Sequence, residues 1–113
     1  MEIYYETFYE EGSRPALNKV VTDGNSFIYT SIGVENTEEL DQIDIETVYL
    51  HMQNMLSYLK FLASQTSLVG IGVLPDEGLP VIGWVEAMKM NEEINRWWMY
   101  LYYKNEATQV LPL

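Results

Sequence analysis

The sequence predicts an α+β fold in which a mostly antiparallel sheet of about five strands packs against one main helix, at about residues 37–65. Two observations carry this prediction. Runs rich in aromatic and β-branched residues alternate with short turn signals on both sides of that segment, and within it apolar residues recur every three or four positions. The chain has 113 residues, which suits a single domain over residues 1–113.

The first part of the chain predicts three strands joined by short turns. Residues 2–9 are dominated by aromatic and β-branched side chains, and the turn-forming residues 11–15 follow them. A second apolar run occupies residues 16–21. Asp23-Gly24-Asn25 separates it from a third β-prone run at residues 26–34, and an Asp-Gly pair between two such runs favours a hairpin.

The main helix is predicted from its cap and from its apolar stripe. Asn36 or Thr37 suits the N-cap, and Glu39 lies three residues after Asn36, which is the spacing of a capping box. The stripe that follows has steps of three and four residues, as expected for one face of a helix: Val48, Met52, Met55, Leu59 and Leu62. Asp44 would serve equally well as a second N-cap, so the acidic stretch before it is alternatively a short separate helix or turn.

The rest of the chain is interpreted as further strands. Residues 68–74 form a short apolar run with two glycines, which favours a buried strand over a helix. Residues 79–90 and 94–103 are predicted as two more strands, because Trp and Tyr are dense in the second and suit a pleated surface. A helix across residues 86–103 is the alternative, since its first half has good helix-forming residues.

The aromatic residues near the C-terminus would form two faces of the last strand. Alternate residues of a strand point to opposite sides, so Trp98, Tyr100 and Tyr102 would share the face that the helix does not cover. Packing within the domain accounts for such residues most simply. Otherwise the face is a candidate binding surface, since Trp and Tyr are enriched where proteins bind one another.

The acidic residues are unevenly distributed along the sequence. The formal net charge is −11, yet residues 1–46 hold 11 acids and 2 bases, which is a net of −9. Residues 35–46 hold six acids and no base. They suit the start of a helix, but they would also attract a basic protein. We therefore expect these six to steer and contact a partner: Glu35, Glu38, Glu39, Asp41, Asp44 and Glu46.

Several functional classes are not expected. Six Lys and Arg are too few for direct nucleic-acid binding, and the absence of Cys excludes thiolate chemistry. Gly70-Ile71-Gly72 lacks the third glycine of a dinucleotide site, and His51 is expected to be a partly exposed, non-catalytic helical residue. We therefore predict no enzyme activity, no catalytic residue, no metal and no cofactor. Without an apolar span or secretory signal, the expected location is cytoplasmic, with no membrane association.

The leading hypothesis is a small inhibitor that binds the basic surface of a nucleic-acid-handling enzyme. Carboxylates would then occupy positions where phosphates otherwise bind. Two settings fit this mechanism: a phage protein that blocks a defence nuclease, of the anti-CRISPR type, and an immunity protein that neutralises a toxin. The alternative is a structural or assembly subunit that associates through the aromatic face, for example as a homodimer.

Overall fold

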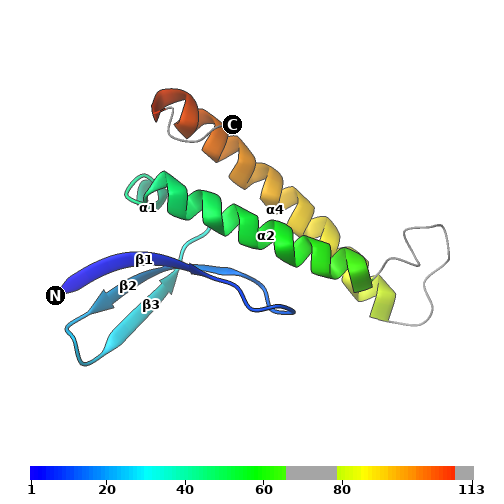
Figure 1. Cartoon of the computed structure of the whole chain (residues 1–113), viewed down its shortest axis with the longest axis horizontal. Helices are drawn as coiled ribbons and strands as arrows, with labels where there is room; N and C mark the ends of the chain where they lie inside the picture. Colours follow the sequence, from blue (N-terminus) through cyan, green and yellow to red (C-terminus); the bar gives the residue numbers. More distant parts are fainter. Residues whose placement is uncertain (66–78, 109–113) are drawn as a thin grey trace.

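The structure, a computed structural model, describes residues 1–65 and 79–108, which form an α+β fold (Figure 1). The elements follow one another along the chain in this order: β1 (Glu2–Phe8), β2 (Ala16–Thr22), β3 (Phe27–Ser31), α1 (Thr37–Leu40), α2 (Ile45–Gln65) and α4 (Leu79–Thr108). The general fold class predicted from the sequence is thus confirmed. The predicted details, about five strands and a single main helix, differ from what the described residues show.

The three strands pair in sequence order as an antiparallel sheet, which confirms the strands predicted at residues 2–9, 16–21 and 26–34. The register places Val20 between Tyr4 on β1 and Tyr29 on β3. At the second turn the carboxylate of Asp23 accepts the backbone N–H groups of Asn25 and Ser26, both at 2.9 Å. Gly24 has a φ of +98° there, which suits glycine and explains the Asp-Gly signal.

The segment predicted as one helix is divided by a turn, so the alternative of a short separate helix before Asp44 is correct. The short helix α1 is capped by Asn36, whose side chain accepts the N–H of Glu39 at 3.4 Å. The chain then turns through residues 41–44, and α2 begins with Thr47 and Val48 bonded to the carbonyl of Asp44. Aspartates favour such helix ends over helix interiors because their side chains compete for backbone hydrogen bonds.

The predicted strands at 79–90 and 94–103 are wrong, because this region forms the long helix α4. The alternative, a helix across residues 86–103, is confirmed. Its buried residues recur every three or four positions: Ala87, Met90, Ile94, Trp97 and Leu101. This periodicity belongs to a helix, and its burial against α2 outweighs the β propensity of the neighbouring Trp and Tyr residues. The strand predicted at 68–74 lies outside the described residues.

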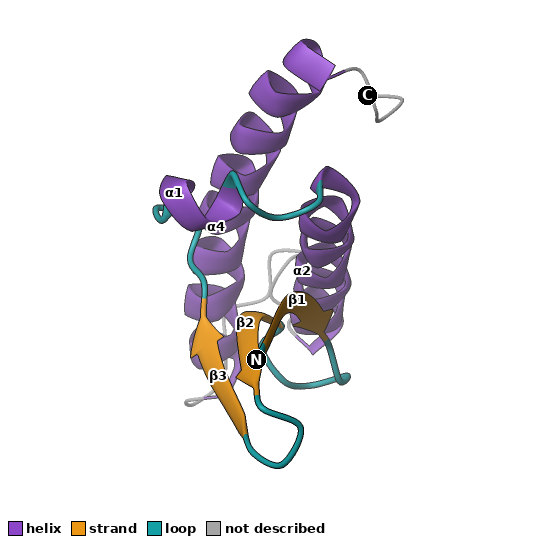
Figure 2. Cartoon of the chain, turned by 90° about the vertical axis from the view of Figure 1, so that its left-hand side faces the viewer, coloured by secondary structure: helices purple, strands orange, loops and turns teal. Residues whose placement is uncertain are grey.

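The core lies between one face of the sheet and the two long helices. Figures 1 and 2 show α2 running over the sheet, with α4 beside it in roughly the opposite direction. Leu17 of β2, Met52 and Met55 of α2, and Met90 and Trp97 of α4 are all almost completely buried there. The C-terminal end of α4 extends past α1 and past the start of α2 (Figure 2). The acidic residues at α1 therefore lie beside the second half of α4.

Candidate functional site

The segment of residues 35–46 passes from the end of the sheet through α1 to the first turn of α2. Five of its six acids are exposed, and only Glu39 is half-buried. The sequence prediction treated all six as one group available to a partner. Within the part of the chain that it describes, the structure separates them into acids that bond to other residues and acids that do not.

Glu39 connects α1 to the sheet. The Tyr5 hydroxyl of β1 donates to Glu39 Oε2 at 2.9 Å, and the Lys19 ammonium of β2 lies 3.2 Å from Oε1. The hydrogen bond from Tyr5, followed by that from Lys19, holds the pKa of the Glu39 carboxyl below its usual value. Both carboxylate oxygens are therefore occupied, and we assign Glu39 to folding.

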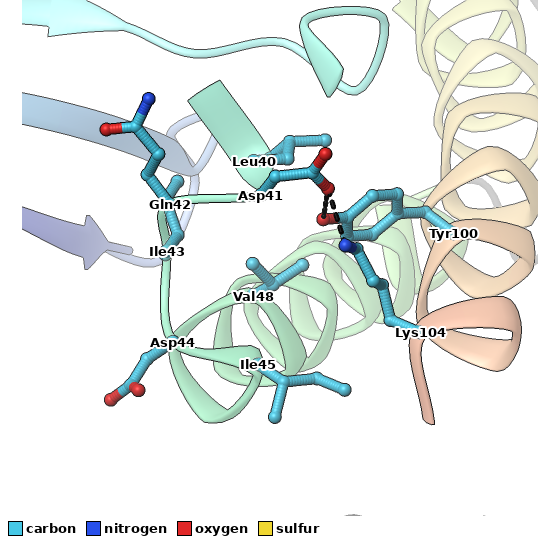
Figure 3. A pocket seen from close by; sticks show the side chains of 9 residues that line it. All are labelled: Leu40, Asp41, Gln42, Ile43, Asp44, Ile45, Val48, Tyr100 and Lys104. Carbon is cyan, nitrogen blue, oxygen red and sulfur yellow. Dashed lines mark hydrogen bonds and ion pairs between the residues drawn. The ribbon is translucent and has the colours of Figure 1, made fainter. Parts of the chain in front are cut away.

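Asp41 connects the turn between α1 and α2 to α4 (Figure 3). Its Oδ1 lies 2.6 Å from the Lys104 ammonium and accepts the Tyr100 hydroxyl at 3.1 Å. These two bonds, with that of Lys104 the larger cause, lower the pKa of Asp41. Burial, and then Asp41 itself, raises the pKa of Tyr100 far above its ordinary value. These contacts border a hollow of about 300 Å³. The carboxylate of Asp44, at the edge of the hollow, points away from it (Figure 3).

The other four acids are unpaired among residues 1–65 and 79–108. Glu35, Glu38, Asp44 and Glu46 are exposed, and none of their side chains has a hydrogen bond or ion pair within that part of the chain. We call these four the free acids. Because they lie within twelve residues of one another and form no ion pair among the described residues, they give this end of the molecule a concentrated negative charge.

The aromatic residues predicted as one face of a strand lie instead on different sides of α4. Trp98 and Tyr102 are one helical turn apart, and they are 43% and 46% exposed. Tyr100 is half-buried and bonded to Asp41, so it does not share their face. The sequence interpretation also missed Met99 and Tyr103, which are exposed beside them. Trp98 and Tyr102 are four residues apart, and so are Met99 and Tyr103. This helical spacing is the sequence signal that could have identified the four residues as one group.

An apolar hollow of about 330 Å³ joins the acidic segment to α4. Val34, Glu35 and Thr37 line one side of it, and Arg96 and Met99 are among the α4 residues on the other side. Met99, an exposed residue of α4, and Glu35, the first of the free acids, thus border the same depression.

We call the free acids together with Trp98, Met99, Tyr102 and Tyr103 the docking surface. No family model, curated protein or solved structure matches the chain. The role of this surface has therefore to be inferred from its own chemistry. It combines negative charge with large, exposed apolar side chains, and such side chains carry much of the binding energy at protein interfaces.

His51 was predicted to be partly exposed, and it is instead buried, with 4% of its surface accessible. Its Nδ1 lies 2.9 Å from the Thr7 hydroxyl, which accepts the amide of Asn54 at 3.0 Å. The ring packs edge-on against Trp97 at 4.9 Å between centroids. Burial, with a smaller contribution from Arg14, lowers the pKa of His51 to about 4. The imidazole is therefore neutral at physiological pH, and its contacts join α2 to β1 and α4.

Residues 1–65 and 79–108 contain no group of three or more His, Asp or Glu side chains positioned to hold a metal ion. In the same part of the chain, no helix has the length and apolarity needed to cross a membrane.

Proposed function

We propose that this protein binds a basic protein partner through the docking surface, and that the partner is a nucleic-acid-handling enzyme whose basic surface becomes occupied. The observation that supports this most directly is that Glu35 and Met99, one residue from each half of the surface, line the same hollow. Charge alone would serve solubility, and scattered apolar residues are common on any protein. Negative charge and an exposed apolar side chain at the same hollow together suit recognition of a partner.

The two halves of the surface have different roles in this proposal. The free acids raise the rate of encounter with a basic surface, because opposite charges attract over roughly a Debye length. Trp98 and Tyr102 then supply apolar contact area, which slows dissociation. A defence nuclease blocked by a phage protein and a toxin neutralised by an immunity protein would both present the basic groove that this mechanism requires.

The test uses two matched triple variants of the full chain. Glu35→Gln, Glu38→Gln and Glu46→Gln neutralise three free acids, whereas Glu2→Gln, Glu10→Gln and Glu11→Gln neutralise three exposed acids elsewhere. A nuclease captured from host cells on the wild-type chain is then tested for loss of nucleic-acid binding. The first triple should slow its association about tenfold at low salt and flatten the salt dependence. The second triple should change the rate much less.

The aromatic half is tested separately with Trp98→Ala combined with Tyr102→Ala. Because neither side chain belongs to the buried core, the fold should persist, and the complex should dissociate faster with little change in association rate. The proposal is contradicted if both charge triples have the same effect. It is also contradicted if the captured partner binds nucleic acid equally well with and without this protein.

A further inference from the structure

Strand β3 is an edge of the sheet that carries no charge. It pairs with β2 on one side, and all five of its residues are exposed. Phe27, Ile28 and Tyr29 are at least half exposed, although they are large and apolar or aromatic. Residues 26–34 contain neither the Lys nor the Pro that commonly protects an edge strand from pairing. A free, apolar edge of this kind is a template for another strand.

The register identifies which backbone groups of this edge are unused. The N–H of Ile32 bonds to the carbonyl of Leu17 at 2.8 Å, in line with the β2–β3 register. Bonded and non-bonded positions alternate in an antiparallel ladder, so Thr30 and Ile28 also bond to β2. The N–H and C=O groups of Phe27, Tyr29 and Ser31 therefore point outward. Among the described residues these groups have no backbone partner beyond the sheet.

We propose that a second copy of this chain pairs with β3 in antiparallel fashion, about a two-fold axis at Tyr29. Tyr29 would then face Tyr29 of the second copy, and Phe27 would face Ser31 of the second copy. This register is self-complementary, so every outward N–H of the three residues receives a carbonyl and every outward carbonyl receives an N–H. The two sheets would join into one continuous antiparallel sheet with β3 from each copy at its centre.

The occupant is a second copy because of where the charges lie. Each chain carries a net charge of −11, so contact through the acidic segment would bring like charges together. At β3 two copies meet without any charged strand residue. The face bearing Tyr4, Val20 and Tyr29 would extend as one row across the axis, because these residues are cross-strand neighbours. The docking surface uses other residues, so this inference is independent of the proposed function.

The test measures self-association of the full chain by sedimentation equilibrium. The wild type should form a dimer, and Tyr29→Lys should weaken it about tenfold, because two lysines would meet at the axis. Leu50→Lys is the matched control, since Leu50 is 53% exposed on α2 and the same charge is added away from β3. This control should dimerise as the wild type does. A wild type that stays monomeric, or a control that dissociates equally, overturns the proposal.

Amide hydrogen exchange distinguishes this dimer from one formed elsewhere. The amides of Phe27, Tyr29 and Ser31 should exchange rapidly in dilute monomer and become protected as the concentration rises. The amides of Ile28 and Thr30 bond to β2 and should be protected in both states. A dimer that leaves the Tyr29 amide unprotected would use another surface, and a series of higher oligomers would indicate pairing without a two-fold axis. Either result overturns the proposal.

Discussion

The acids of residues 35–46 differ in whether their carboxylates are bonded to other residues. The difference arises from how close each one lies to a cation or a hydroxyl group. Glu39 meets Lys19 and Tyr5, and Asp41 meets Lys104 and Tyr100, whereas Glu38, directly before Glu39, has no such partner among the described residues. The pKa values of Glu39 and Asp41 are lowered, so their contribution to folding is present at neutral pH. It is lost only as the pH falls through those lowered pKa values.

His51 should make the protein less stable in mildly acidic solution. Its pKa is 6.5 when unperturbed and about 4 in the fold, so between these values the unfolded chain binds a proton that the folded protein does not. The free energy of unfolding should therefore fall by about 3 kcal/mol as the pH decreases through this window. Urea unfolding at several pH values measures the decrease.

The variant His51→Gln separates this effect from that of the carboxylates. It should be less stable at neutral pH, because the ring contact with Trp97 is lost, but its stability should vary less between pH 6.5 and 4. The carboxyl groups of Glu39 and Asp41, whose pKa values are lowered, are the same in the variant and the wild type, so their contribution cancels in the comparison. An equal pH dependence in the variant and the wild type would show that folding does not lower the pKa of His51.

At the scale of elements, α4 shows how packing selects between two local preferences. Its second half contains many Trp and Tyr residues, which favour a strand, but Trp97 and Leu101 are buried one helical turn apart against the core. Strand alternation would place Met99 with them, whereas Met99 is 51% exposed. The helix is the conformation that buries one continuous stripe and leaves the docking surface accessible.

Two alanine substitutions in α4 distinguish the helix from a strand in this segment. Leu101→Ala removes a fully buried side chain and should lower the free energy of unfolding by about 2–5 kcal/mol. Met99→Ala removes an exposed side chain of similar size and should change it by only about 0.5 kcal/mol. Chemical denaturation of both variants makes the comparison. Equal losses would mean that Met99 and Leu101 lie on the same buried face.

On the scale of the whole molecule, charge and apolar surface are distributed in different ways. Negative charge is concentrated at the end formed by α1 and the start of α2, while β3 has none. Exposed aromatic side chains occur both on α4 and on the sheet. These are the two surfaces for which we propose different contacts, one with a basic partner and one with a second copy.

Added salt should stabilise the protein, because it screens repulsion within a chain of net charge −11. Glu35→Gln, Glu38→Gln and Glu46→Gln together change the net charge from −11 to −8. Repulsion grows with the square of the charge, so the rise in thermal midpoint between low and moderate salt should fall to roughly half. Thermal unfolding monitored by circular dichroism measures this. A rise as large as that of the wild type would show that these acids do not repel the rest of the molecule.

Local sequence signals determined much of this protein. The Asp23-Gly24 turn and the β-prone runs around it define the strands, because turn geometry and strand propensity act over a few residues. The apolar stripe of α2 is likewise present in the spacing of its own residues. The concentration of acids at residues 35–46 needs no structure to be recognised.

Only the tertiary structure decided the conformation of α4, the burial of His51 and which acids are free. Each of these depends on a partner distant in sequence: α2 for α4, Thr7 for His51, and Lys104 for Asp41. The secondary-structure propensity of a short segment carries no information about such long-range contacts. In this protein the long-range contacts outweigh local propensity. Burial of a continuous helical stripe and pairing of charges across 63 residues are properties of the folded chain as a whole.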